Sequence, residues 1–564
     1  MIRKMILAII ILLSFGCEDE ENRNSLVLSR NEVNLASEGG TSNIILQTDA
    51  EEWRILNPAD WITLDPVNGT GPDAVVELTV GSIVPESRSA TMTVVAGTES
   101  VDVVVTQAAS EFIYTMNTNY ELMNYGPSGG ALELRVITNS PDFDISSEDT
   151  WLEFEQISKV DDVSTVLVSV PNNPTSDLRE SKIIVSAEYA PSVEIDVVQI
   201  GEYYPSYNTT PIEPDETGMT STATELAANM TFGINIGNTL EAIGGETSWG
   251  NPQITKDLID AYKAEGFDAI RIPCSFDQYA NVNTAKISDS WLNRVKTVVN
   301  YCVENDLQVV LNIHWDGGWL ENNVTASQQE RVNAKQKAYW EQIATHLRDF
   351  DEHLIFASAN EPHADNASEM SVLDSYHQTF VDAVRSTGGK NSYRVLVVQG
   401  ASTDIEKTEE LFTTFPTDEV PNKLMAELHY YTPYQFCLME EDADWGNIFY
   451  YWGDGFHSDT DTERNATWGE EEELDRLFGI THDQFVRNGY PVVLGEFGAY
   501  KRSNIPDQEL HEASVDYFNK YVVQACLENG FIPFYWDTGG LINRNTGEVR
   551  DQTLMDAMRE GAGQ

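Results

Sequence analysis

Two patterns of hydrophobic and polar residues divide the chain. From residue 24 to about residue 200, short runs alternate polar and apolar side chains between turn signals, and no stretch sustains a helical period. From about residue 219 to residue 564, short apolar runs alternate with longer stretches whose apolar residues recur at helical spacing. The first pattern predicts an all-β region, and the second predicts an α/β domain.

The all-β region contains two copies of one unit. Strands are expected at residues 44–46, 75–80, 90–95 and 101–105 of the first copy. Four features of this copy return 90 to 92 residues later: Gly39-Gly40 at Gly129-Gly130, Trp61-Ile62 at Trp151-Leu152, Arg88 at Arg179, and Gln107 at Gln199. An ordered repeat of this kind predicts two small β-sandwiches, at residues 24–109 and 110–200.

The repeated features resemble the BACON domain, a module that often stands between a lipid anchor and a glycan-degrading domain. The resemblance implies two immunoglobulin-like sandwiches. Trp53, Trp61 and Trp151 could stack on sugar rings, but a Trp in a small sandwich more often fills its core. We therefore expect the sandwiches to be spacers, with glycan binding by residues 24–200 as the alternative.

The α/β domain shows eight apolar runs in about 340 residues. They are residues 231–237, 269–273, 308–313, 354–359, 394–399, 423–428, 491–494 and 532–535, and helical spacing is clearest at 254–265, 288–305, 330–350 and 511–528. This order predicts a (β/α)8 TIM barrel over residues 219–564, after a Pro- and Tyr-containing linker at 201–218. A doubly wound sheet is the rival fold, but no Gly-rich dinucleotide fingerprint follows the first run.

Barrel enzymes place their chemistry at the carboxyl ends of the strands. Polar or aromatic residues follow seven of the eight runs, and two of them, Glu361 and Glu496, follow runs four and seven, which face each other across a barrel mouth. A retaining glycosidase needs one carboxylic acid to protonate the leaving oxygen and one carboxylate to attack the anomeric carbon, roughly 5–5.5 Å away. Either glutamate alone could be a rim salt bridge, but the pair predicts catalysis.

Motifs around these residues resemble glycoside hydrolase family 5, in particular its subfamily 4. They are Gly233–Glu241, Glu246–Pro252, Arg271-Ile272-Pro273, Asn360-Glu361-Pro362, His429-x-Tyr431, Glu496 and Trp536, in family order and over the whole third segment. The resemblance implies a retaining endo-β-1,4-glucanase with Glu361 as general acid/base and Glu496 as nucleophile. It also implies binding of the substrate by residues of the first loop, including Asn238 and Trp249.

The remaining matched residues have physical roles that follow from the resemblance. Arg271 and Tyr431 are expected to hold Glu496, and Asn360 the sugar 2-hydroxyl. His314, His429 and Trp536 are expected to line the subsite where the bond breaks. Trp315 departs from the family, which commonly has a second His there, so the local contacts to sugar hydroxyls are in doubt. The acid needs a raised pKa, which we expect from the Glu496 charge and from burial of Glu361.

No cofactor is expected, because the double-displacement chemistry needs none. A metal site is the alternative, but no HxH follows the first run and the nine His are scattered, so we expect no metal. Besides Cys17, the sequence has Cys274, Cys302, Cys437 and Cys526, which lack zinc spacing and are expected to be buried. The net charge of −57, from 91 acidic and 34 basic residues, excludes nucleic acid as a partner.

The first residues are expected to be a lipoprotein signal peptide. Arg3 and Lys4 precede an apolar run that is too short to span a bilayer, and Ser14–Cys17 resembles a lipoprotein cleavage site. We expect the signal at residues 1–16, lipidation at Cys17, an acidic tether at 17–23, and an outer-membrane protein that faces the cell surface. The alternative is an ordinary secretory signal with an incidental Cys.

Long aromatic loops follow the third and sixth runs. They hold Trp315, Trp319, Tyr434, Trp445, Phe449, Tyr450, Tyr451, Trp452, Phe456 and Trp468, of which about half are expected to pack the loops themselves. Aromatic faces suit pyranose rings, and a long platform favours internal cleavage of a polymer. The expected partner is a β-glucan, either cellulose-like, mixed-linkage or xyloglucan, bound by a monomer. The alternatives are an endo-acting xyloglucanase or glucomannanase and, from another class, a non-catalytic surface glycan-binding lipoprotein.

Overall fold

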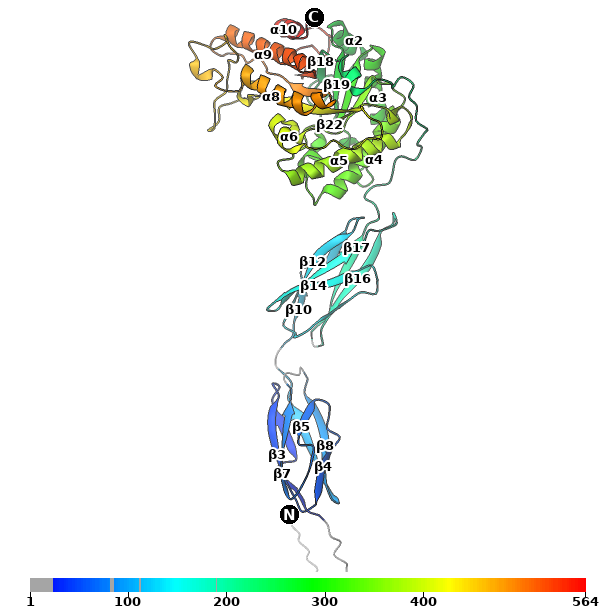
Figure 1. Cartoon of the computed structure of the whole chain (residues 1–564), viewed down its shortest axis with the longest axis vertical. Coiled ribbons are helices and arrows are strands. Elements are labelled where there is room, and N and C mark those ends of the chain that lie inside the picture. Colours follow the sequence, from blue (N-terminus) through cyan, green and yellow to red (C-terminus); the bar gives the residue numbers. More distant parts are fainter. Residues whose placement is uncertain (1–23, 82–85, 111–112, 189) are drawn as a thin grey trace, which may run out of the picture. The chain divides into compact units, whose positions relative to one another are not determined.

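The computed structural model describes residues 24–81, 86–110, 113–188 and 190–564. It contains two small β-sandwiches and one α/β barrel (Figure 1). The predicted signal peptide, Cys17 and the acidic tether lie outside the described residues. Within the described part of the chain, no helix is both long and apolar enough to cross a membrane.

The first sandwich packs a four-stranded sheet, β1-β3-β7-β5, and a five-stranded sheet, β2-β9-β8-β4-β6, around one core. Alternation along the strands builds this core, since Ile44 and Leu46 of β3 are buried whereas Ile45 between them is exposed. The strands are β1 (Leu26–Leu28), β2 (Glu32–Leu35), β3 (Gly40–Thr48), β4 (Glu52–Leu56), β5 (Ile62–Asp65), β6 (Asn68–Thr70), β7 (Asp73–Val80), β8 (Arg88–Ala96) and β9 (Glu99–Gln107).

The second sandwich has the sheets β10-β12-β15-β14 and β11-β17-β16-β13. Its strands are β10 (Met116–Thr118), β11 (Leu122–Tyr125), β12 (Gly130–Thr138), β13 (Asp144–Ser146), β14 (Glu153–Val160), β15 (Val163–Val170), β16 (Arg179–Ser186) and β17 (Val193–Gln199). The sequence repeat is also a structural repeat: Arg88 Nε donates to Gln107 Oε1 at 3.0 Å, and Arg179 Nε donates to Gln199 Oε1 at 2.8 Å.

The sandwich tryptophans differ in their burial. Trp53 lies in the core of the first sandwich, under Gly69. Trp61 is partly buried and covered by the Arg88 guanidinium, 4.3 Å from its ring centre, and Trp151 is partly buried. None of the three is an exposed ring, which favours a core role over sugar stacking.

The third domain is a closed barrel of eight parallel strands in sequence order, which confirms the predicted fold class. The strands are β18 (Gly233–Ile236), β19 (Ala269–Cys274), β20 (Gln308–Ile313), β21 (Leu354–Ala357), β22 (Leu396–Gln399), β23 (Leu424–Tyr430), β24 (Val492–Phe497) and β25 (Phe531–Asp537). The helices are α1 (Ala223–Ala227), α2 (Lys256–Ala264), α3 (Asp289–Glu304), α4 (Gln329–Leu347), α5 (Ala367–Ser386), α6 (Ile405–Leu411), α7 (Tyr434–Cys437), α8 (Glu471–Gln484), α9 (Gln508–Glu528) and α10 (Gln552–Gly561).

Two hydrophobic layers hold the barrel together. Every second residue of a strand packs outward against the surrounding helices, as Ile270 and Ile272 of β19 do. The alternate residues face the barrel interior, where Ala269, the residue before Ile270, lies in an inner cluster that α1 completes with Leu226. The same two-residue period carries Arg271 inward, and this alternation decides which side chains reach the site.

The helices start where the sequence supplies caps. Ser288 caps α3, Thr255 caps α2 and Asn366 caps α5, each with its side chain accepting backbone N–H groups of the first turn. The helical stripe of α3 buries Trp291, Leu292, Val295, Val298, Val299 and Cys302. Capping and stripe together fix how the helix packs on the barrel wall.

The segment before the barrel is bound along the barrel's surface. The Glu341 carboxylate on α4 accepts hydrogen bonds from Ser206 Oγ at 3.1 Å, Tyr207 N at 2.6 Å and Asn208 N at 3.1 Å. Residues 206–208 are therefore part of the barrel domain's packing. The four barrel cysteines, predicted to be buried, are buried and unpaired.

Candidate active site

Polar side chains converge at the carboxyl ends of the barrel strands. Arg271 comes from β19, Glu427 from β23, Glu496 from β24 and Trp536 from β25, while Glu361 lies just beyond β21. The mouth that they share is the face on which barrel enzymes carry their chemistry. The barrel's closure thus brings together residues that are up to 265 positions apart, from Arg271 to Trp536.

Glu361 and Glu496 face each other at the centre of this mouth. One carboxylate oxygen of each lies within 4.8 Å of the other and of a His429 ring nitrogen. Their surroundings differ, because the Glu361 side chain is 43% exposed and that of Glu496 is 8% exposed. This separation suits a retaining hydrolase, in which one carboxylate attacks the anomeric carbon and the other protonates the leaving oxygen on the opposite face, and the difference in exposure suits two roles.

Glu496 is held by hydrogen bonds from two side chains, and His314 lies beside it. Arg271 Nη1 donates to Oε1 at 3.1 Å, Tyr431 OH donates to Oε2 at 3.1 Å, and His314 Nδ1 lies 3.9 Å from Oε1. Burial raises the pKa of Glu496, the charges of His429 and Arg271 oppose that rise, and the result is a pKa above the ordinary value. The predicted holding of Glu496 by Arg271 and Tyr431 agrees with these contacts.

Arg271 is the fully buried hub of the site. Its Nη2 donates to Asn360 Oδ1 at 2.9 Å, its Nη1 also donates to Asn235 Oδ1 at 3.0 Å, and its Nε lies 2.8 Å from Glu427 Oε1 in an ion pair. Burial opposes the charge, but Glu427 and Glu496 raise the pKa of Arg271. Two carboxylates thus share one cation, so neither is fully neutralised by it.

His429 bridges the buried network and the exposed glutamate. Its Nδ1 lies 2.6 Å from Glu361 Oε1, and its Nε2 lies 3.3 Å from Glu427 Oε1. Burial lowers the pKa of His429, but the charge of Glu496 and the bonds to Glu361 and Glu427 raise it to about 9. His429 is therefore an imidazolium at neutral pH, with both N–H groups directed at carboxylates.

The expected rise in the pKa of Glu361 is wrong for this structure. Burial does raise the pKa of that carboxyl, but the hydrogen bond and charge of His429 outweigh burial and hold the pKa below its ordinary value. The charge that decides the direction is the His429 imidazolium, which contacts Glu361 directly, and not the Glu496 carboxylate. In the free enzyme the proton of the Glu361–His429 pair therefore lies on His429.

Trp536 and His314 form an aromatic wall beside Glu496. Their rings are stacked, with centres 5.5 Å apart and planes inclined by 11°. Burial and the Arg271 charge lower the pKa of His314 well below its ordinary value, so this ring is neutral. A flat indole beside Glu496 suits the face of a pyranose ring.

Trp249 and Trp315 stand on the rim, and both are exposed. Trp315 has φ 35°, and the loop after it is fixed by Asp316, whose Oδ2 accepts Phe276 N and Asp277 N, each at 2.6 Å. The loop of Trp249 is fixed by Glu246, which takes two hydrogen bonds from Arg294.

Asn238 lies in the first loop, just after β18, and its contact with substrate stays a prediction. Its backbone N–H donates to Glu241, and its carbonyl accepts Asn251 Nδ2 at 3.1 Å. Its φ of 57° lies in the left-handed region that Asn tolerates. These contacts give Asn238 a role in shaping the first loop.

Sequence reasoning missed Glu427, Asn235 and Gln399. Gln399 Nε2 donates to Glu427 Oε2 at 2.7 Å, and Asn235 Nδ2 donates to Gly495 O at 2.8 Å beside the nucleophile. A signal existed for Glu427, which stands two residues before His429 on β23, the spacing at which side chains share one face of a strand.

The three groups Glu361, His429 and Glu496 could also be considered as metal ligands, since one atom from each lies within 4.8 Å of the others. A metal needs the lone pair of a neutral imidazole. Because His429 has a pKa of about 9 and directs both N–H groups at carboxylates, that lone pair is not free at neutral pH. The donor set therefore fits proton transfer better than metal binding.

A barrel mouth with two apposed carboxylates, one buried and one open, defines a glycoside hydrolase of the retaining type. Residues 234–540 match the family model for cellulase, glycosyl hydrolase family 5, and the chain belongs to that family. Residues 51–108 and 141–199 match the BACON model, described as a putative N-terminal binding domain. The predicted class, a retaining hydrolase of endo-β-1,4-glucanase type, is confirmed.

Individual relatives agree with this family. The chain is 34% identical over 455 residues to a xyloglucan-specific endo-β-1,4-glucanase of Bacteroides ovatus, covering 77% of this chain and 88% of the relative. It is 37% identical over 372 residues to endoglucanase A of Paenibacillus barcinonensis, covering 60% and 90%. Among solved structures, the Bacteroides ovatus family 5 xyloglucanase with a XXXG heptasaccharide has a TM-score of 0.59 at 32% identity, covering 80% of this chain and all of that one. A xyloglucan-specific β-1,4-glucanase from a ruminal metagenomic library, in complex with XXLG, has a TM-score of 0.57 at 39% identity, covering 61% and 96%.

Proposed function

We propose that this protein is a retaining endo-β-1,4-glucanase that hydrolyses xyloglucan. The observation that carries the reaction is the placement of Glu361 and Glu496 with oxygen atoms within 4.8 Å. The substrate rests on the relatives, since a Bacteroides ovatus relative aligned over 77% of this chain is specific for xyloglucan and two similar structures hold xyloglucan oligosaccharides. Structures described as broad-specificity endoglucanases are also similar, so unbranched β-glucans are the second candidate.

In the first step, Glu496 attacks the anomeric carbon and forms a glycosyl-enzyme ester. The bond from that carbon to the leaving oxygen breaks, and Glu361 gives this oxygen a proton that His429 has returned to it across 2.6 Å. Arg271 and Tyr431 keep Glu496 ionised and aimed, because each donates a hydrogen bond to a different carboxylate oxygen. Asn360 and Trp536 are the proposed contacts to the sugar itself.

In the second step, water replaces the leaving group. Glu361, now a carboxylate, removes a proton from the water as its oxygen attacks the anomeric carbon, and the ester to Glu496 breaks. Glu496 leaves as a carboxylate, and the sugar keeps its β configuration after two inversions. The proton taken from water restores the Glu361–His429 pair, so the cycle closes.

Reducing sugar released from xyloglucan, barley β-glucan, carboxymethyl-cellulose and glucomannan tests the substrate. We expect xyloglucan to give the highest kcat/KM for the wild type and Glu496→Ala to give no release. A higher kcat/KM on an unbranched glucan contradicts the xyloglucan proposal, and no release from any polymer contradicts the glucanase proposal.

Azide rescue tests the roles of the two glutamates separately. On an activated aryl glycoside, azide should replace Glu496 in Glu496→Ala and give the α-glycosyl azide by one inversion. In Glu361→Ala it should intercept the glycosyl-enzyme and give the β-glycosyl azide. If Glu496→Ala gives the β-glycosyl azide and Glu361→Ala gives the α-glycosyl azide, the roles of the two glutamates are reversed.

We also propose that the enzyme is an outer-membrane lipoprotein anchored through Cys17, on the evidence of residues 1–21 alone. Labelling with radioactive palmitate in a Gram-negative host should mark the wild type and not Cys17→Ala. Equal labelling of both, or of neither, contradicts lipidation at this residue.

A further inference from the structure

The strand that carries Glu496, β24, contains an extra residue at Gly495. Leu428 of β23 pairs with Leu494, but the next residue of β23 pairs with Glu496. The register between β24 and β25 shifts in the same interval. Gly495 is therefore the extra residue of a β-bulge, placed directly before the glutamate.

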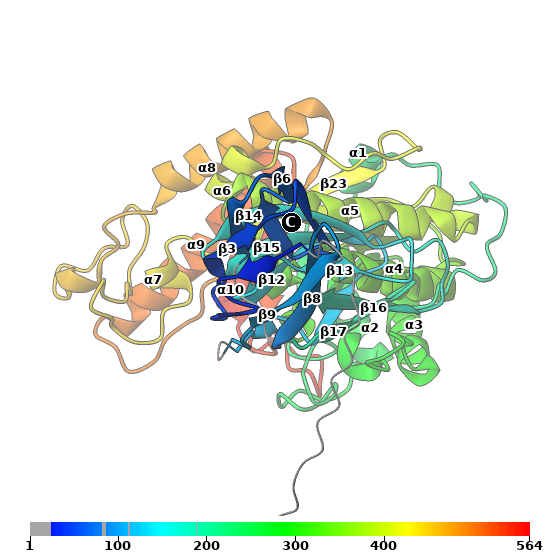
Figure 2. The ribbon, with the colours of Figure 1, turned by 90° about the horizontal axis from the view of Figure 1, so that it is seen from below.

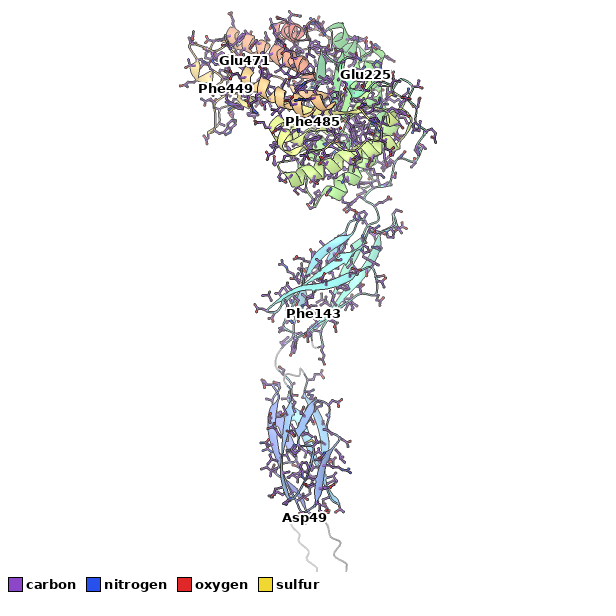
Figure 3. The ribbon with its side chains drawn as sticks, in the orientation of Figure 1. Asp49, Phe143, Glu225, Phe449, Glu471 and Phe485 are labelled. Carbon is purple, nitrogen blue, oxygen red and sulfur yellow. The ribbon has the colours of Figure 1, made fainter. Side chains whose placement is uncertain are left out.

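This bulge decides which way the Glu496 side chain points. Val493 faces the barrel interior, whereas Leu494 and Phe497 belong to the outer layer that packs on the helices. The helices that cover this layer, among them α8 and α9, lie at the barrel's periphery in Figure 2, and Figure 3 labels Phe485, one of the layer's residues. In a strand of strict alternation, Glu496 would point outward like Leu494. The extra residue shifts the alternation by one position and directs Glu496 into the mouth.

The bulge fits only a glycine at position 495. A Cβ at that position would overlap the Glu427 carboxylate. Glu427 cannot move aside freely, because Arg271 Nε lies 2.8 Å from its Oε1 and Gln399 Nε2 donates to its Oε2 at 2.7 Å. The bulged backbone and the buried ionic network therefore pack directly against each other.

Asn235 supplies the side-chain hydrogen bond that holds the bulge. Its Nδ2 donates to Gly495 O at 2.8 Å and lies 3.2 Å from Phe534 O of β25. Its Oδ1 accepts Arg271 Nη1 at 3.0 Å, and the same Nη1 donates to Glu496 at 3.1 Å. Asn235 thus binds both the backbone before Glu496 and the cation that holds the Glu496 carboxylate.

The alternation along β18 places Asn235 inside the barrel. Ile234 and Ile236, on either side of it, pack in the outer layer, and Asn235 is fully buried between them. A buried amide adds little stability once its desolvation is counted, so its value lies in the contacts that it makes. Because it is fully buried, Asn235 does not touch a bound sugar.

We propose that Asn235 is a positioning residue for the nucleophile, which holds the Gly495 bulge that directs Glu496 into the mouth and aligns Arg271 with the same carboxylate. The inference rests on the proposed role of Glu496 as nucleophile and adds the feature that orients it. A displacement of about 1 Å at a reacting atom costs about a hundredfold in rate. Loss of the Asn235 amide should therefore slow the attack by Glu496 and leave the binding of the sugar unchanged.

Covalent trapping with a dinitrophenyl 2-deoxy-2-fluoro-β-cellotrioside isolates this attack. The Glu496 carboxylate forms an ester with the anomeric carbon, and dinitrophenolate leaves with the electron pair of the bond that breaks. This leaving group needs no proton from Glu361, and the fluorine slows hydrolysis of the ester, so the labelled enzyme accumulates.

We expect Asn235→Ala to lower the first-order labelling rate at saturation about a hundredfold. The half-saturating concentration should stay within about twofold of wild type. Asn235→Asp, which keeps the size and the oxygen towards Arg271 but removes the N–H donors, should lose labelling rate as well.

Asn391 provides the matched control, because it makes the same kinds of contact before the start of β22, at the end of the barrel opposite the mouth. It is fully buried, its Nδ2 donates to Ala344 O at 2.8 Å, and its Oδ1 accepts Arg394 Nε at 2.8 Å. Asn391→Ala should lower the unfolding temperature about as much as Asn235→Ala does. Its labelling rate should stay within about twofold of wild type.

A labelling rate within about twofold of wild type in either Asn235 variant overturns the inference. So does an equal fall in Asn391→Ala, a change confined to the half-saturating concentration, or failure of both Asn235 variants to fold while Asn391→Ala folds. The proposed function fails in a different way, since the wild type would then take no label on Glu496.

Discussion

The hydrogen bond between His429 and Glu361 predicts an unusual pH dependence. In the free enzyme the pair holds one proton, which sits on His429, with the two groups 2.6 Å apart. Acid catalysis needs that proton at Glu361, and transfer within the pair supplies it. The pair is competent as long as it retains this one proton, so its titration is shared and belongs to neither residue alone.

The sign of the effect follows from which proton is lost last. In the wild type, raising the pH removes the last proton at the pKa of His429, about 9, so activity on polymer falls only above that pH. His429→Asn removes the imidazolium and leaves Glu361 as the only proton store. Burial, no longer opposed by the bond and charge of His429, then raises the pKa of Glu361 above its value in the wild type. The alkaline limb should therefore move to lower pH, from the titration of His429 to that of the Glu361 carboxyl.

The assay is the pH dependence of kcat/KM, which reports the free enzyme. Xyloglucan, with a poor leaving group, should show the full displacement of the alkaline limb. An aryl glycoside with a nitrophenolate leaving group needs little protonation, so its alkaline limb should stay nearly unchanged. Circular dichroism of His429→Asn at each pH separates titration from unfolding.

Movement in the other direction refutes the reasoning. If Glu361 titrates alone, the wild-type alkaline limb lies at its lowered pKa, and His429→Asn moves that limb upward because the bond that lowers the pKa is lost. An unmoved limb means that another group controls it. The two mechanisms thus predict opposite signs from one substitution.

Three further results are expected. Arg271→Lys keeps a positive charge but loses the guanidinium contacts to Glu496, Asn360 and Glu427, so kcat/KM should fall at least about a hundredfold. The acid limb should move to higher pH, because Glu496 must be ionised and the burial that raises its pKa is less opposed. An unchanged pH profile contradicts this role. Glu341→Ala leaves three hydrogen-bond donors of residues 206–208 without their acceptor, so the barrel's unfolding temperature, measured by calorimetry, should fall by several degrees while kcat is unchanged. Glu341→Gln is the control and should lose less. Equal unfolding temperatures of wild type and Glu341→Ala would show that these hydrogen bonds do not stabilise the barrel. EDTA should leave the initial rate unchanged, since protonated His429 has no lone pair for a metal, and a loss that Zn²⁺ or Ca²⁺ restores contradicts this.

The barrel and its two glutamates could be predicted from the sequence because the patterns that indicate them lie within short, continuous segments. Glu361, in the sequence Asn-Glu-Pro, follows an apolar run directly. Its position at the end of that run predicts that its side chain lies at the barrel mouth. Glu427 was missed because it lies inside the run at 423–428, where an inward polar residue looks like an interruption of a strand. Its partner Arg271 is 156 positions away, so the pair becomes visible only when the barrel closes.

The aromatic loop shows the same limit. Trp445 and Trp452 are seven residues apart in similar surroundings, yet one is exposed and the other is fully buried. Trp452 is buried because its backbone pairs with Ser514 of α9 and its indole N–H reaches Gly469. Such contacts depend on how α9 docks, which no local pattern encodes. The expected direction of the pKa shift of Glu361 was wrong for a related reason. That shift depends on His429, which is 68 residues away in the sequence but only 2.6 Å away in the structure.

The net charge of the site gives a reason for the many ionised groups that it contains. Arg271 and His429 supply two positive charges, and Glu361, Glu427 and Glu496 supply three negative charges, which leaves one net negative charge in the free enzyme. Positive charge develops at the anomeric carbon in an oxocarbenium-like transition state, beside Glu496. A fixed net charge of −1 stabilises that carbon in a site that already excludes much of the water. Glu427 matters in this balance because it lies 2.8 Å from Arg271 Nε and 3.3 Å from His429 Nε2, so the two cations are shared between Glu427 and the two glutamates at the mouth.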